Sequence, residues 1–272
     1  MKKNYAQLLL LVLAALMALS ACGLLQEPEE ASSPIEAIPL ATQAAGVATR
    51  EPATTEAAEP TAAPVEATMA PAEATLAPEA TVAAPTEAAA AATGAAQVFT
   101  IDQSASQVRF QLDEELRGQP TTVVGTTDQV AGQLSVNLAD LSQTQVGIIQ
   151  INARTLATDN NFRNRAIQNE ILNTGDFEFI TFTPTGIEGL PASATVGEAI
   201  SFSLVGDLTI RDITMPATFT VEATAVSETQ IVGTATAVVN RADFGLQIPS
   251  VPNVANVEEQ VELYIDFTAN AS

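Results

Sequence analysis

Residues 202–221 read FSLVGDLTIRDITMPATFTV, and this stretch decides the fold class. Apolar or small residues take every second position on each side of a turn signal at Asp212, as expected for two strands that each bury one face. The positions on the predicted buried face are Phe202, Leu204, Gly206, Leu208 and Ile210 before the turn and Ala217, Phe219 and Val221 after it. The stretch therefore predicts an antiparallel hairpin.

The same period of two recurs through most of the C-terminal part of the chain. It is found in residues 108–112, 231–239 and 261–267, with further strand candidates at 132–138, 145–151 and 178–183. At least eight strands within residues 97–272 favour an all-β, antiparallel barrel or sandwich.

Residues 159–172 break the alternation. Phe162, Ala166 and Ile167 recur at helical spacing, and Asp or Asn residues at the start of the segment are good helix caps. The segment predicts one short helix, and its position between two strands suggests that it covers an end of the barrel.

The N-terminus carries a different signal, which ends at Cys22, the only cysteine of the 272 residues. Lys2 and Lys3 precede an apolar run over residues 8–19, an arrangement typical of a lipoprotein signal peptide over residues 1–21. The run is shorter than the roughly 20 apolar residues that cross a bilayer. We expect cleavage before Cys22, acylation of Cys22 and anchoring to the cell membrane or outer membrane, outside the cytoplasm. A free thiol in an ordinary secretory signal is the alternative.

Residues 22–96 are expected to form a tether. From residue 26 to 96 the sequence is built mainly from Ala, Pro, Thr and Glu, with eleven Glu and a single basic residue, Arg50. Such a composition buries too little apolar surface to offset its ordering entropy, so we expect disorder. A flexible coil of about 70 residues has an r.m.s. span near 45–50 Å.

The predicted folded domain, residues 97–272, is acidic. It contains 21 Asp and Glu residues against seven Arg and no Lys. This excess argues against nucleic acid as a partner and against direct docking on anionic lipid. The domain has no His or Cys, which excludes nucleophile–His dyads, zinc sites and thiol chemistry. We therefore expect no catalytic residue, no metal site and no cofactor.

Four stretches of the domain, in the same order and spacing, resemble the YceI-like family of bacterial lipid-binding proteins. They are residues 99–110 (FTIDQSASQVRF), 162–182 (FRNRAIQNEILNTGDFEFITF), 206–216 (GDLTIRDITMP) and 240–246 (NRADFGL). The resemblance covers nearly the whole domain. It implies a lipocalin-like, eight-stranded barrel with an internal apolar tunnel that holds an isoprenoid lipid, either a polyprenyl phosphate or a long-tail quinone.

The residues are compatible with such a tunnel. A barrel of about eight strands either fills itself with side chains or holds one small ligand. Small and large residues on predicted inward positions are the candidate tunnel lining: Phe110, Phe182, Phe202, Phe219, Gly233, Ala235, Ala237 and Phe267. The alternative is that the small residues simply complement the large ones in a packed core.

Charged residues near the predicted helix have two interpretations. Arg163 and Arg165 could contact a phosphate or a quinone oxygen at the barrel mouth, or could form ordinary helix ion pairs. Arg241 is expected to brace the turn before Gly245. The acidic run over 113–115 lacks the spacing of a calcium loop and is expected to be a solvated loop.

The sequence thus predicts a lipid-anchored carrier that stores or transfers an isoprenoid lipid without catalysis. One alternative is a packed barrel that serves as a structural or adhesion module. Another is an enzyme that uses paired carboxylates, for which the sequence offers no evident pair.

Overall fold

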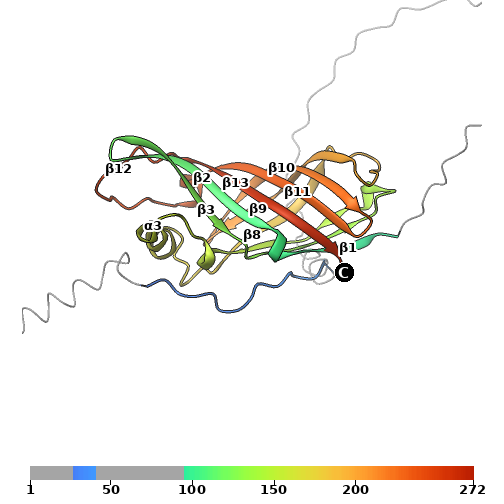
Figure 1. Ribbon diagram of the computed structural model, residues 1–272, viewed down its shortest axis with the longest axis horizontal. Helices are drawn as coiled ribbons and strands as arrows, with labels where there is room; N and C mark the ends of the chain where they lie inside the picture. Colours follow the sequence, from blue (N-terminus) through green and yellow to red (C-terminus); the bar gives the residue numbers. More distant parts are fainter. Residues whose placement is uncertain (1–26, 41–94) are drawn as a thin grey trace, which may run out of the picture.

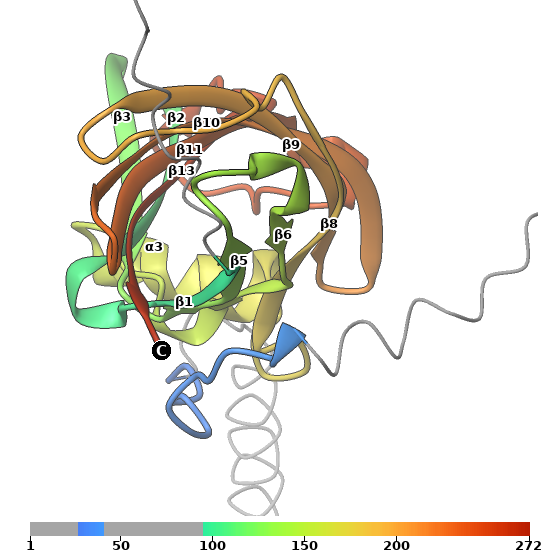
Figure 2. The same ribbon diagram turned by 90° about the vertical axis from the view of Figure 1, so that its right-hand side faces the viewer.

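The computed structural model describes residues 27–40 and 95–272. In these ranges 13 strands form one antiparallel sheet that curls around a common interior (Figures 1 and 2). The strands are β1 (Gln97–Ile101), β2 (Gln107–Leu116), β3 (Gln119–Thr127), β4 (Val130–Ala131), β5 (Gln133–Val136), β6 (Gln145–Val146), β7 (Ile149–Asn152), β8 (Phe179–Glu188), β9 (Ala199–Ile210), β10 (Ile213–Ser227), β11 (Gln230–Asn240), β12 (Val254–Ala255) and β13 (Gln260–Ala271).

The helical elements are short. They are η4 (Gln103–Ala105), η5 (Leu141–Gln143), η6 (Ala153–Thr155), α3 (Asn161–Ala166), the π-helical turn η7 (Ile167–Ile171) and η8 (Arg241–Phe244). Among the residues that the structure describes, no helix is long and apolar enough to cross a membrane.

The sheet curls around its interior and branches at β13. Its main path runs β4-β7-β8-β9-β10-β11-β13-β1-β5-β6, and β2 also pairs with β13, β3 and β12. The chain passes from β3 to β4, which pairs with β7, and Thr126 forms a bridge to Ala157. The lipocalin-like barrel class is therefore confirmed. The described strands outnumber the expected eight because six of them are only two to five residues long.

The hairpin predicted from residues 202–221 is present as β9 and β10. Gly206 lies opposite Ala217, and Leu204 lies opposite Phe219, so the predicted inward residues share one face. Burial alternates along β10, as expected for a strand with one face in the core. Arg211 makes the tight turn with a left-handed backbone, φ 58°.

The helix predicted over 159–172 is present as α3 followed by η7. The Asn160 side chain caps it by accepting hydrogen bonds from the backbone N–H groups of Phe162 and Arg163. Ala166 and Ile167 are buried as expected, but Phe162 is 69% exposed. Phe162 belongs to the first turn of α3, which lies at one end of the barrel (Figure 1).

The barrel interior has two unlike halves along its long axis. At the end formed by β1 and β5, which faces the viewer in Figure 2, side chains fill the core around Phe99, which is 1% exposed, and Ala269. At the opposite end, beside α3 and β12, the inward side chains surround a cavity.

Residues 27–40 lie along the outside of the barrel (Figure 1). Ile35 is buried, and Ser32 hydrogen-bonds to Glu178 in the segment before β8. This part of the expected tether is therefore held against the domain. The predicted signal peptide, Cys22 and residues 41–94 lie outside the described residues.

Candidate functional site

The cavity at the α3 end has a volume of about 370 Å³. Volumes of about 300–1,000 Å³ are typical of small-molecule pockets. Its walls are mostly aliphatic side chains on the inward face of the strands and from the loop after η8: Val108, Leu112, Leu116, Val123, Leu208, Ile210, Val239, Leu246, Ile248, Val251, Val254, Val257, Val261, Leu263 and Ile265. Such a lining suits an apolar ligand, because little polar surface would be desolvated.

Two aromatic rings form the floor of the pocket. Phe182 on β8 and Phe219 on β10 are nearly fully buried, and both line the cavity. Their ring centroids are 4.9 Å apart with an interplanar angle of 69°, the edge-to-face arrangement that aromatic pairs prefer. The pair therefore forms a rigid aromatic part of the cavity wall.

Phe110 lies on the side wall. It sits directly opposite Gly125 on β3, and a Cβ atom on Gly125 would clash with its ring. The ring therefore lies over the glycine and close to the sheet, which leaves the centre of the barrel open.

The predicted tunnel residues divide between the two halves. Phe110, Phe182 and Phe219 line the pocket. Phe202, Gly233, Ala235, Ala237 and Phe267 lie in the other half, outside the pocket lining. There Phe267 lies opposite Gly233, and a Cβ on Gly233 would be 2.7 Å from its ring. The large and small residues complement each other at this position, as in the packed alternative.

The pocket mouth lies between α3 and the loop that carries residues 246–257. Exposed Phe162 contributes to the lining, so the cavity reaches the surface beside α3. The loop was not singled out in the sequence. Its alternating apolar and proline residues, Ile248-Pro249 and Val251-Pro252, were the available signal, because an ordinary surface loop is polar.

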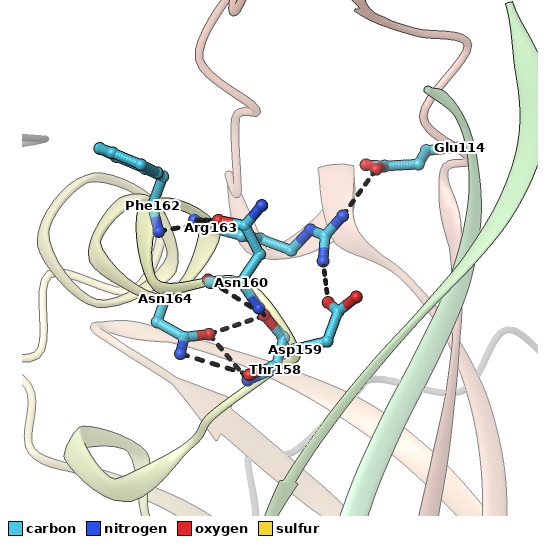
Figure 3. Close-up of polar contacts among 7 residues, drawn as sticks. All are labelled: Glu114, Thr158, Asp159, Asn160, Phe162, Arg163 and Asn164. Carbon is cyan, nitrogen blue, oxygen red and sulfur yellow. Dashed lines mark hydrogen bonds and ion pairs between the residues drawn. The ribbon is translucent and has the colours of Figure 1, made fainter. Parts of the chain in front are cut away.

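One ion-pair cluster spans the mouth (Figure 3). Arg163 on α3 extends one guanidinium nitrogen to Glu114 at 2.9 Å and another to Asp159. Glu114 is 8% exposed and lines the pocket. The expectation of a solvated loop at 113–115 is wrong, because these residues belong to β2 and the alternation that points Phe110 and Leu112 inward also points Glu114 inward.

Two more arginines, Arg241 and Arg165, lie near the pocket end of the barrel. Arg241 donates to the backbone carbonyls of Glu258, Leu246 and Val257 and pairs with Glu259 at 2.6 Å. It therefore braces the turn before Gly245, as predicted, while lining the pocket. Arg165 lies half-buried on α3, outside the pocket lining.

Arg109 on β2 is the remaining arginine that borders the pocket. Its guanidinium lies 4.2 Å from the centre of the Tyr264 ring on β13. Both residues alternate with inward residues and therefore face outward. The Tyr264 hydroxyl donates a hydrogen bond to Glu262, and this bond, together with burial, raises the pKa of Tyr264.

The charged residues that line the pocket are Arg109, Glu114, Arg163 and Arg241. Arg163 is shared by Glu114 and Asp159, and Arg241 pairs with Glu259, so both of these arginines already have carboxylate partners within the protein. In the described part of the chain no group of three or more acidic residues could hold a metal ion. The site therefore offers an apolar cavity and a self-neutralised rim.

Comparison with known proteins agrees with this geometry. Residues 99–269 match the family model of the YceI-like domain. A polyisoprenoid binding domain from Saccharophagus degradans, implicated in plant cell wall breakdown, is similar in structure, with a TM-score of 0.51 and 15% identity over 65% of this chain and 99% of that one. Burkholderia cenocepacia BcnA has a TM-score of 0.50 and 17% identity over 62% of this chain and 99% of its own. The curated proteins contain no sequence match to the chain.

Proposed function

The chain belongs to the YceI-like family, and on that premise we propose that it binds an isoprenoid lipid in the cavity between α3 and the loop over residues 246–257. The observation that carries the proposal is the cavity of about 370 Å³, which is walled by aliphatic side chains inside a barrel of that family. The related domain from Saccharophagus degradans, which is described as polyisoprenoid binding, supports the same ligand class.

The binding energy would come from burial of the isoprenoid tail. Each Å² of apolar surface removed from water contributes about 25 cal/mol. The wall presents branched aliphatic groups such as Val239, Val261 and Leu263, which match the branched methyl groups of an isoprenoid in size. The protein's role is to hold and release the lipid, with no bond made or broken.

The rim of the mouth favours an uncharged head group. Arg163 is already shared by Glu114 and Asp159, and Arg241 is shared by Glu259 and three carbonyls. A phosphate that reached Arg163 would have to compete with the carboxylates of Glu114 and Asp159, and like charges at short range are costly in a partly buried site. Of the two head groups that the sequence left open, the quinone fits better than the phosphate.

The proposed setting is the outer side of a membrane. The lipoprotein signal that ends at Cys22 supports acylation there, which would keep the carrier beside the bilayer that contains its ligand. Stable anchoring by more than one acyl chain also offsets the repulsion between an acidic domain and anionic lipid.

Substitutions at two adjacent residues of β11 test the proposal. Val239→Phe would place a ring in the pocket, whereas Val238→Phe would place it on the outer face, where Val238 is 59% exposed. Titration of the full chain with a long-tail quinone should show affinity at least about tenfold lower in Val239→Phe, equivalent to ~1.4 kcal/mol, and unchanged affinity in Val238→Phe.

A wild-type chain that purifies without bound isoprenoid and binds no added long-tail quinone or polyprenol would contradict the proposal. The packed-barrel structural or adhesion module would then be the better interpretation.

A further inference from the structure

The segment before the long low-complexity stretch has a defined place on the barrel. Residues 27–40 run along the outside of the sheet from the α3 end toward the β1 end (Figure 1). Glu29 pairs with Arg154 at the α3 end, and the backbone N–H of Leu40 donates to Gln133 on β5 at the other end. We name residues 27–40 the strap.

Two groups of contacts fix the strap. The first is polar: the hydroxyl and the backbone N–H of Ser32 donate to the two carboxylate oxygens of Glu178, at 2.6 and 2.9 Å. Arg154 links the same carboxylate to Glu29 and donates to the carbonyl of Glu30. The Glu178 carboxylate is thus shared by the strap and the barrel.

The second contact is apolar. Ile35 is 4% exposed, and its carbonyl accepts a hydrogen bond of 2.6 Å from the Gln103 side chain. Burial of a full isoleucine side chain is unusual for a low-complexity tether, whose composition gives few apolar groups to bury. The strap therefore has an apolar anchor and a polar clamp about three residues apart.

The start of the strap lies beside the pocket end of the barrel. Glu29 contacts Arg154 and approaches Gly175, and Gln168 on η7 donates to the carbonyl of Arg154. The residues that receive the strap thus pack against the helical cover of the pocket. Cys22 precedes Glu27 by five residues, and five extended residues span at most about 18 Å.

From these contacts we infer that the strap is a docking element that holds the pocket mouth toward the membrane. The inference rests on the proposed acylation of Cys22. With the strap docked, the anchor reaches the barrel through a few residues at the α3 end, instead of through a coil with a span near 45–50 Å. The exposed ring of Phe162 then lies on the side that faces the lipid surface.

Matched double variants test the docking. Ser32→Ala with Ile35→Ser removes the hydroxyl donor of the clamp and the apolar anchor, whereas Ser33→Ala with Glu36→Ser changes exposed neighbours. All four positions lie outside the barrel strands, so the fold should persist. Hydrogen exchange of the full mature chain should show a protected Ser32 amide, which donates to Glu178, in the wild type and the control, and at least tenfold faster exchange of this amide in the docking variant. Equal exchange in all three proteins would overturn the docking.

Fluorescence on vesicles tests the orientation. Acylated Cys22 leaves no other thiol, so Gln119→Cys at the β2–β3 turn and Glu228→Cys at the β10–β11 turn each give a single labelling site. Quenchers attached to lipid head groups should quench the label at 119 more than the label at 228. The difference should vanish in the docking variant. Equal quenching at the two positions in the wild type would overturn the orientation.

The two proposals fail in distinguishable ways. A chain that lacks acyl groups by mass spectrometry overturns the anchor and the orientation, while hydrogen exchange still decides whether the strap docks. A chain that docks and orients but binds no lipid leaves the strap intact and overturns the carrier function.

Discussion

The two halves of the barrel are built from the same alternating strands and yet one is filled and the other hollow. In the filled half, Phe267 lies opposite Gly233 and Phe99 is almost completely buried. In the hollow half, Phe110 lies over Gly125 against the wall, and most of the remaining wall residues are aliphatic. The difference shows that inward-facing residues fill the interior only where side chains from opposite walls are long enough to contact one another. Where they are shorter, a cavity remains.

The largest expected effect is on stability, when one aromatic ring is removed from each half of the barrel. Phe99→Ala should reduce the free energy of unfolding by about 3–5 kcal/mol, because a large cavity would open in a packed region. Phe110→Ala should cost less, since the space it leaves joins an existing pocket. Urea unfolding measures both. Equal losses would mean that the halves are packed alike.

The second prediction concerns substitutions that enlarge a side chain instead of truncating one. Gly233→Val should destabilise the protein by about 1–3 kcal/mol, because the new side chain would meet the Phe267 ring and the carbonyl of Glu222. Gly186→Val is the control on β8, where no atom lies within 4 Å of an added Cβ. Thermal unfolding of the two variants gives the comparison, and a harmless Gly233→Val would show that this half has unused space.

The third prediction tests whether the charged residues at the rim of the hollow half set the preference for the lipid head group. Glu114→Gln removes one of the carboxylates that share Arg163. The affinity for a polyprenyl phosphate should rise about tenfold, or ~1.4 kcal/mol, relative to the polyprenol of equal length. Glu115→Gln, whose side chain contacts Asn256, should leave the preference unchanged. A wild type that already prefers the phosphate would contradict the neutral-head interpretation.

The smallest effect concerns the strap and pH. Burial alone would raise the pKa of Glu178, but hydrogen bonds from Ser32 and Asn152 and the charge of Arg154 outweigh it and hold the pKa below its ordinary value. Docking is therefore stabilised by the ionised carboxylate, and this contribution is lost as the pH falls through the lowered pKa. The other charged group in the contact is Glu29, which also pairs with Arg154.

Exchange of the strap amides, measured from neutral pH to about pH 3 and corrected for intrinsic rates, should show weaker protection at acid pH. Glu178→Gln should remove most of this dependence. Protection that is the same at both ends of the range in the wild type would show that Glu178 does not contribute to docking through its charge.

The sequence predicted most of the long strands and most of the inward faces, but it did not single out β3 (Gln119–Thr127). Burial along β10 follows the period of two that predicted it, and the helix begins at the expected Asn160 cap. Glu114 was overlooked although it continues the inward positions of Phe110 and Leu112, because acidic residues are normally placed in solvent. Helical spacing placed Phe162 on one face with Ala166 and Ile167, and all three line the pocket, but this spacing could not show that the Phe162 side chain is exposed.

By itself the sequence determined the barrel class, the family and the exclusion of His- and Cys-dependent chemistry from the domain, since these depend on residue types and local spacing. Only the tertiary structure decided which half is hollow, that Arg163 meets Glu114 across 49 residues, and that Ser32 meets Glu178 across 146. Such contacts depend on how the whole sheet curls and on which side chains meet across it. A local sequence pattern does not specify which of these residues, far apart in the chain, come into contact.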